Sequence, residues 1–287
     1  MSLPRFPVLA GASWSLACAV RQPLETALVL VSTTGLIAVQ ALVIGFLERA
    51  DVLPPPAMAA LFIVSALLVP MVTIPAWMRV LVQKPLPAGI PLRLGRREFQ
   101  VVWAHVLVGV ALVAAVVPAS LAWTFAGYSA GLAAGSGSAP GSLTALLPML
   151  VLAASIILGL TISVRFGAAP ALTLVRGRVV FDEAWTASKR IWPGVALAVI
   201  LAAASVFVAG AIIRWATGLD LLSTAQEIAL DSDSPLWVLN TLVKAVLEVL
   251  AAFIMAGPFA FLALQYEAGR NEGAHASGDT AREQTHV

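Results

Sequence analysis

A run of 66 consecutive residues, 99–164, contains no Asp, Glu, Lys or Arg. Soluble domains carry about 25% charged residues, so a run of this length does not suit a water-soluble fold. A membrane-spanning helix uses only about 20 apolar residues, and this run is long enough for two. Gly127–Ser142 are rich in Gly and Ser and contain Pro140, which predicts a loop between the two helices.

Charged residues and prolines mark the ends of the other spans. Glu25 and Glu48 enclose one uncharged stretch, and prolines at 54–56 and at Pro193 open two more; proline is favoured in the first helical turn. A charge at the bilayer centre costs about 2.5 to 3.5 kcal/mol on insertion scales, so such boundaries are informative. The six predicted spans cover residues 26-47, 57-79, 100-126, 143-165, 193-214 and 236-265.

The composition agrees with this division. Of the 287 residues, 60% are hydrophobic and 11% charged, and the mean hydropathy is +0.94. We therefore expect an all-α, polytopic transmembrane bundle with cytoplasmic interfacial helices, built as a single membrane domain over 1-268. The polar tail, 269-287, is predicted to be disordered. Tryptophan prefers the membrane interface, and six of the eight lie near predicted helix ends: Trp77, Trp103, Trp123, Trp192, Trp215 and Trp237.

The basic residues predict the orientation. Fourteen Lys and Arg fall on the side that holds both termini, against only Arg49 and Arg214 on the other. By the positive-inside rule, both termini are predicted to be cytoplasmic. No removable signal peptide is recognised, and the single Cys18 on the reducing side excludes a disulfide framework. A bacterial inner membrane is the expected location.

A second feature is an amphipathic segment between the fourth and fifth spans. At helical spacing, one face would carry Phe181, Ala184, Trp185, Ser188 and Trp192. Such a segment suits an interfacial helix in the headgroup layer, and equally a connecting helix packed on the bundle. The N-terminal stretch Val8–Arg21 is predicted to be a weakly apolar helix.

These segments carry a family resemblance. The residues concerned are Arg165, Pro170, Ala171, Ala184, Trp185, Thr186 and the step from Lys189 to Trp192, with the preceding PLRLGRREF at 91–99. Together they resemble a bacterial six-helix membrane family that groups YciC-like proteins, the DUF975 proteins and the glycerophosphodiester phosphodiesterase membrane domain. The resemblance implies a polytopic membrane protein of largely unknown function. The phosphodiesterase label comes from fusion to a catalytic domain, which is not expected in this chain.

Catalytic signatures are not found. The three histidines are His105, near the cytoplasmic end of the third span, and His275 and His286 in the polar tail. No pair has metal-ligand spacing, and the sequence GSGSAPGS lacks the strand and the Lys-Ser or Lys-Thr step of a nucleotide-binding loop. We expect no metal, no cofactor, no nucleic-acid partner and no enzymatic activity.

The most informative polar pair is Lys244 and Glu248. They share a face of the sixth span at i, i+4 spacing, and counting from Trp237 at about 1.5 Å per residue places Glu248 roughly 16 Å deep. One interpretation is a proton or ion relay or a polar substrate path, with Asn240, Gln40 and His105 contributing. The other is a neutralised pair that faces the bundle interior and fixes helix packing.

The cytoplasmic basic residues also have two interpretations. They could bind anionic lipid headgroups, at about 1 kcal/mol each, or they could only set the topology. The candidates are Arg93, Arg96, Arg97, Arg176, Arg178, Lys189 and Arg190. The function expected from these features is a non-enzymatic role in lipid organisation or as a partner of other membrane proteins. The alternative is a small-solute, lipid or ion transporter; the oligomeric state is left open.

Overall fold

The computed structural model describes residues 6–84, 92, 95–136, 142–217 and 235–284. Within these ranges every element is a helix, and six helices are long and apolar enough to cross a membrane. The prediction of an all-α polytopic bundle is therefore confirmed, and the chain is a multi-pass membrane protein. The long helices are α3 (Pro23–Arg49), α4 (Pro55–Leu81), α5 (Arg96–Ser136), α6 (Ser142–Phe166), α9 (Trp192–Thr217) and α11 (Pro235–Gln284).

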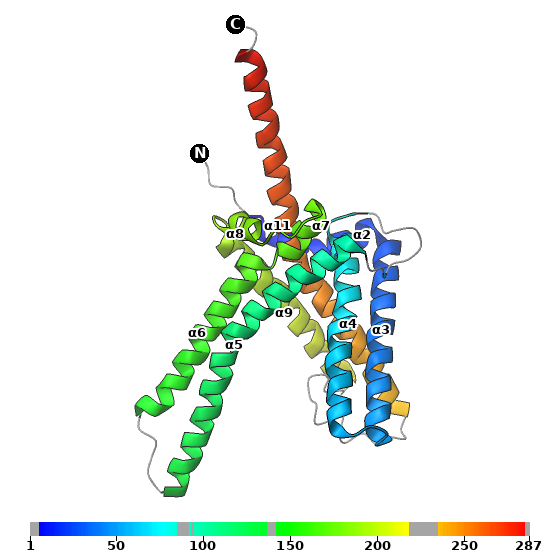
Figure 1. Ribbon diagram of the computed structural model, residues 1–287, viewed down its shortest axis with the longest axis vertical. Coiled ribbons are helices and arrows are strands. Elements are labelled where there is room, and N and C mark those ends of the chain that lie inside the picture. Colours follow the sequence, from blue (N-terminus) through cyan, green and yellow to red (C-terminus); the bar gives the residue numbers. More distant parts are fainter. Residues whose placement is uncertain (1–5, 85–91, 93–94, 137–141, 218–234, 285–287) are drawn as a thin grey trace.

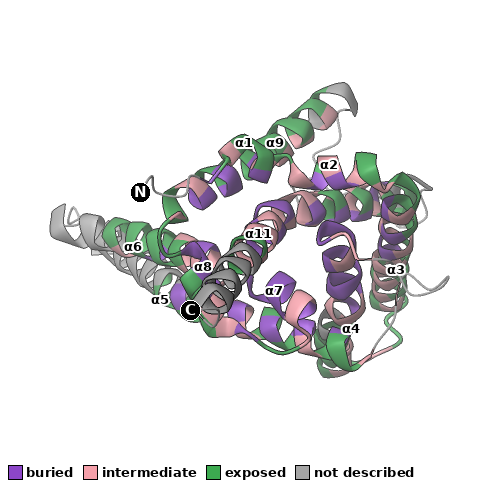
Figure 2. Ribbon diagram, turned by 90° about the horizontal axis from the view of Figure 1, so that it is seen from above, coloured by how far each residue is buried: buried purple, intermediate pink, exposed green. Residues whose placement is uncertain are grey.

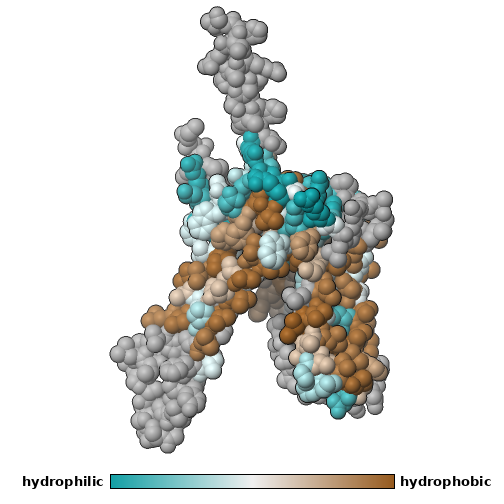
Figure 3. Space-filling model, viewed as in Figure 1, coloured by the Kyte–Doolittle hydropathy of each residue, from teal (hydrophilic) through white to brown (hydrophobic). Residues whose placement is uncertain are grey.

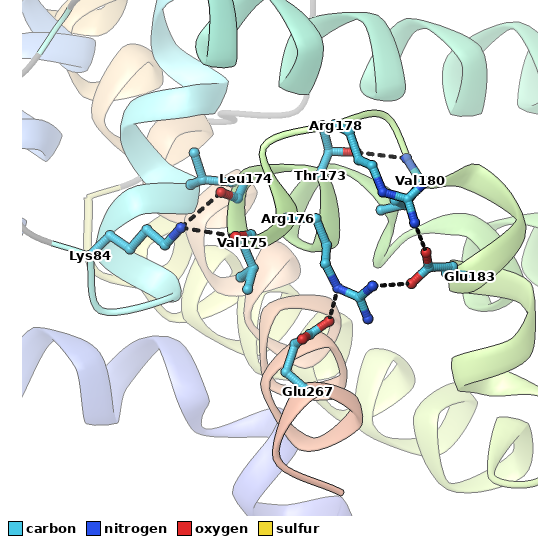
Figure 4. Close-up of polar contacts among 9 residues, drawn as sticks. All are labelled: Lys84, Thr173, Leu174, Val175, Arg176, Arg178, Val180, Glu183 and Glu267. Carbon is cyan, nitrogen blue, oxygen red and sulfur yellow. Dashed lines mark hydrogen bonds and ion pairs between the residues drawn. The ribbon is translucent and has the colours of Figure 1, made fainter. Parts of the chain in front are cut away.

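Four short helices lie between or before the long ones. The N-terminal stretch forms α1 (Val8–Ala12) and α2 (Trp14–Arg21), and the segment after α6 forms α7 (Ala169–Arg176) and α8 (Phe181–Ser188). Figure 1 shows these four elements and both chain termini at one end of the bundle. This end also carries Lys84, Arg176 and Arg178 (Figure 4). We call it the basic end, and the opposite one the far end.

The structure differs from the prediction at two helix ends. The loop predicted to begin at Gly127 is wrong as far as Ser136, because α5 continues to that residue. Residues 137–141 lie outside the described ranges. The tail predicted to be disordered from 269 likewise continues α11 to Gln284. Helix propagation is cooperative and needs no new nucleus, so an established helix extends through residues that would not start one.

The two hairpins of the bundle diverge from the basic end. In Figure 1 the α5–α6 pair and the α3–α4 pair spread apart toward the far end, and Figure 2 shows from above that α11 lies in the middle while α9 lies to one side, beside α1. Figure 3 shows a wedge between the two arms, with hydrophobic surface on the described parts of both. The described parts of the two arms therefore diverge toward the far end.

The packed core is concentrated near the basic end. In α4 most buried side chains fall between Val69 and Leu81, and in α5 between Val101 and Val108. Only 12% of the most apolar window of α4 is buried, against 44% for α11, the central helix. Toward the far end, large apolar side chains such as Phe62, Ile63 and Ile156 are exposed, as expected of residues that face lipid.

Helix α7 is part of this core. Its residues from Ala169 to Leu174 are all buried, and it contacts α5, α4, α8 and α11. The segment of α8 has features of both a connecting helix packed on the bundle and an interfacial helix. Ala184, Ala187 and Ser188 are buried against the bundle, whereas Trp185 and Trp192 are 42% and 47% exposed.

Candidate functional site

The predicted intramembrane pair lies on a partly exposed stretch of α11. Glu248 is exposed and Lys244 is half-buried, whereas Ala245 and Val249 beside them are buried. The packing interpretation requires both charged residues to face the bundle interior, and Glu248 does not. The pair therefore lies at the margin of the packed surface of α11.

The other polar candidates, which were predicted to contribute to a path with this pair, lie on separate helices. Asn240 is buried on α11, and Gln40 on α3 donates a hydrogen bond from Nε2 to Ser65 Oγ on α4 at 2.9 Å. His105 is exposed on α5, nine residues from the start of that helix at the basic end. These three residues therefore lie on three different helices, with only Asn240 on the same helix as Lys244 and Glu248.

A network of ion pairs ties three elements together at the basic end (Figure 4). Arg176, the last residue of α7, places Nε 2.5 Å from Glu267 Oε1 on α11 and Nη1 2.9 Å from Glu183 Oε2 on α8. Arg178 adds a second pair to Glu183, at 2.6 Å. Since the Arg176 side chain is only 12% exposed, its two ion pairs are shielded from solvent and hold α7, α8 and α11 together.

Lys84 caps the C-terminus of α7. Its Nζ donates to the backbone carbonyls of Leu174 at 2.9 Å and Val175 at 3.3 Å (Figure 4). These are among the carbonyls that a helix leaves without an internal partner. Burial, and then the neighbouring charges of Arg97 and Arg79, lower the pKa of Lys84. Arg79 itself forms an ion pair with the buried Glu98 at the start of α5.

The motif residues of the family resemblance surround the junction of α6, α7 and α8. The Arg165 guanidinium lies 4.7 Å from the centre of the Trp185 ring, and Phe166 stacks on Phe181 with ring centres 4.3 Å apart. Pro170 is buried in the first turn of α7. Arg165 and Trp185 thus make a cation–π contact, while Trp192 begins α9 and is half-exposed.

The basic candidates for lipid headgroups divide by exposure. Arg96, Arg97, Lys189 and Arg190 are exposed. Arg176 is half-buried in its ion pairs, and Arg178 is paired but keeps 65% of its side chain exposed. Arg93 lies outside the described residues. Four of the seven candidates are thus available at the surface without disturbing the described ion-pair network.

Sequence reasoning missed a polar cluster where α2 meets α3. Among the described residues, the buried atoms Gln22 Oε1, Glu25 Oε2 and Thr26 Oγ1 have no hydrogen-bond partner. Cys18 lies one turn before Gln22, and its thiol contacts the side chain of Gln83, which follows α4. Burial raises the pKa of Cys18, whereas the hydrogen bond with Gln83 and the charge of Arg21 lower it by a smaller amount. Gln83 also has a left-handed backbone, with φ of 55°. The spacing of residues 22, 25 and 26 could have indicated their proximity, but not their burial.

The comparisons add no relative: no family model, curated protein or solved structure matches the chain. Within the described ranges, no group of three or more His, Cys, Asp or Glu side chains is placed to hold a metal ion. The arrangement of the described polar residues therefore has to be interpreted from its own chemistry.

Proposed function

We propose that the protein is a non-enzymatic lipid-binding protein of the bacterial inner membrane that organises lipids around its diverging helices. The observation that supports this most is the confinement of the packed core to the basic end. The described parts of both arms carry exposed apolar side chains on either side of the wedge (Figure 3). Exposed apolar surface of this kind is unfavourable in water, so acyl chains are the natural material to fill the space between them.

The exposed basic residues supply the headgroup contacts in this proposal. Arg96 and Arg97 begin α5, and Lys189 and Arg190 follow α8. Near an anionic leaflet each contributes about 1 kcal/mol of attraction. Anionic phospholipids would thus have their headgroups at the basic end and their chains along the arms.

Quantification of co-purified lipid tests this function. The protein is purified in mild detergent and its retained phospholipids are counted by native mass spectrometry. We expect anionic lipids to be enriched over the surrounding membrane, and the variant R96Q/R97Q/K189Q/R190Q to lose most of that enrichment. Arg49→Gln removes a charge at the other end of α3 and serves as control. Equal enrichment in the fourfold variant would contradict the proposal.

The same proposal places the basic end and both termini in the cytoplasm, because Lys and Arg are retained on that side. Fusions of a fluorescent protein and of alkaline phosphatase to the C-terminus distinguish the two orientations. We expect a fluorescent fusion and an inactive phosphatase fusion. An active phosphatase would place the basic end outside.

The exposure of Glu248 favours a second candidate, a transporter of a small solute, lipid or ion. A carboxylate that faced hydrocarbon would cost several kcal/mol, so polar surroundings are expected around it. In a transporter, Glu248 and Lys244 would line the path. Glu248→Gln should then abolish transport, and unchanged transport with lowered stability would leave only the lipid-binding function.

A further inference from the structure

The polar cluster at the α2–α3 junction has the chemistry of a binding site. Its three oxygens come from an amide, a carboxylate and a hydroxyl: Gln22 Oε1, Glu25 Oε2 and Thr26 Oγ1. Thr26 is only 3% exposed, and Gln22 and Glu25 are half-buried. A buried polar atom without a partner costs free energy, and a charged one costs more. The cluster therefore favours a partner that is a cation or a hydrogen-bond donor.

The backbone brings these oxygens to one place. Gln22 is the N-cap residue of α3, and Glu25 and Thr26 lie in the first turns of that helix, so the three side chains start within about one helical turn of one another. Val29 and Thr33 continue the face of Thr26 along α3 and are fully buried, which turns that face toward the bundle interior. At Gln22 the helix is broken, with φ of −132° and ψ of 63°. The bonds from Gln22 N to Cys18 O and from Thr26 N to Gln22 O keep the two helices end to end.

The charge of Glu25 is not met by a described ion pair. Arg21, one turn earlier, is exposed and lies 5.3 Å from the centre of the Trp14 ring. The cluster thus carries one negative charge and two neutral oxygens in a partly desolvated position. A single positive charge would balance it, whereas a divalent ion would leave an excess positive charge and prefers several carboxylates.

We propose that Gln22, Glu25 and Thr26 bind one monovalent cation at the junction of α2 and α3. Hard oxygen ligands suit an alkali cation, and broken helices hold such ions in other membrane proteins. Three acceptors also match the three N–H donors of a primary ammonium. The cation comes either from solution, as Na⁺ or K⁺, or from the ethanolamine headgroup of a phospholipid. This site is independent of the lipid-organising function.

Thermal unfolding at constant ionic strength tests the site. Protein in nanodiscs of choline phospholipid is titrated with NaCl or KCl against N-methylglucamine chloride. A second series replaces choline by ethanolamine phospholipid without alkali ions. We expect the wild-type midpoint to rise saturably in at least one series, which also identifies the source of the cation. Glu25→Gln and Thr26→Val should raise the apparent Kd at least tenfold, and Thr26→Ser should preserve binding.

The order of stabilities gives a second criterion. Without cation, Glu25→Gln should be at least as stable as the wild type, because it removes a desolvated charge; at saturating cation the order should reverse. Glu48→Gln, an exposed position at the other end of α3, should behave as wild type. Equal responses of the wild type and Glu25→Gln, or a wild-type midpoint that no series shifts, would overturn the proposal and leave bound water as the partner of these oxygens.

Discussion

At the residue scale, several polar side chains of this protein bind backbone carbonyls that helices leave free. Pro258 within α11 has no N–H for the carbonyl of Ile254, four residues earlier. Ser15 on α2 meets this part of α11, donating to Phe253 O at 2.7 Å and reaching Ile254 O at 3.5 Å. Prolines in a span are tolerated when neighbouring groups satisfy the freed backbone, and Ser15 supplies a donor beside it, bonded mainly to Phe253 O and within 3.5 Å of the freed Ile254 O.

Replacing Ser15 tests this role. Ser15→Ala removes the buried donor, so we expect a loss of about 1–3 kcal/mol and a lower midpoint of thermal unfolding in detergent. Ser13→Ala is the matched control, because Ser13, between α1 and α2, makes an exposed hydrogen bond from Oγ to Leu9 O, four residues earlier. Equal midpoints for the two variants would show that the Pro258 region does not need Ser15.

Lys84 predicts a pH dependence with a definite sign. Burial and the charges of Arg97 and Arg79 lower its pKa below the ordinary lysine value of 10.5, so the unfolded chain holds the proton more tightly than the folded one. Stability contributed by this position therefore rises with pH between the folded pKa and 10.5. The midpoint difference between the wild type and Lys84→Met should grow from pH 7 to pH 10. A constant or shrinking difference would contradict this.

The residue scale is also where the sequence was least informative. Hydropathy and spacing identified Lys244 and Glu248, but periodicity does not tell which side of a span faces its neighbours, and Glu248 is exposed. The partners of Arg176 come from α8 and α11, at Glu183 and Glu267. Such contacts follow from tertiary packing, so a single sequence does not predict them.

At the element scale, close approach of α2 to α11 depends on a glycine. A Cβ at Gly257 would meet Ser15 Oγ and would lie 3.0 Å from Ser15 N. Gly159 on α6 has open space at the same position, although the sequence places it in a comparable apolar helix. The two glycines therefore differ in what they permit: only Gly257 allows two backbones to pack closely.

Alanine substitutions separate these two glycines. Gly257→Ala should push α2 away from α11 and lower the unfolding midpoint, because the added Cβ would clash with Ser15 Oγ and also crowd the backbone nitrogen of Ser15. Gly159→Ala should be neutral or stabilise by up to about 1 kcal/mol, because alanine favours helix over glycine. Circular dichroism melts of both variants provide the comparison, and a stabilising Gly257→Ala would refute the close contact.

Helix existence was predictable and helix ends were less so. Charge-free runs and prolines indicated all six spans, because a bilayer requires long apolar segments whose backbone is satisfied internally. The end of α5 was not predictable from Gly and Ser content, since a helix begun at Arg96 continues to Ser136. Burial of α7 was also missed, because its short length and basic end resemble a surface segment.

At the scale of the whole molecule, the bundle is joined at the basic end and open toward the far end (Figure 1). Ion pairs of Arg79 and Arg176 and the Lys84 cap lie where the core is dense. The far parts of the arms expose large apolar side chains. This division explains how one chain can hold a packed platform at the basic end while its arms present separate apolar surfaces.

The most direct test is an electron cryomicroscopy map of the protein in nanodiscs that contain anionic phospholipid. We expect the α3–α4 and α5–α6 arms to remain apart, with elongated density of acyl chains between them and headgroup density beside Arg96, Arg97, Lys189 and Arg190. A map in which the two arms close and their side chains interdigitate, with no density between them, would contradict the lipid-binding account.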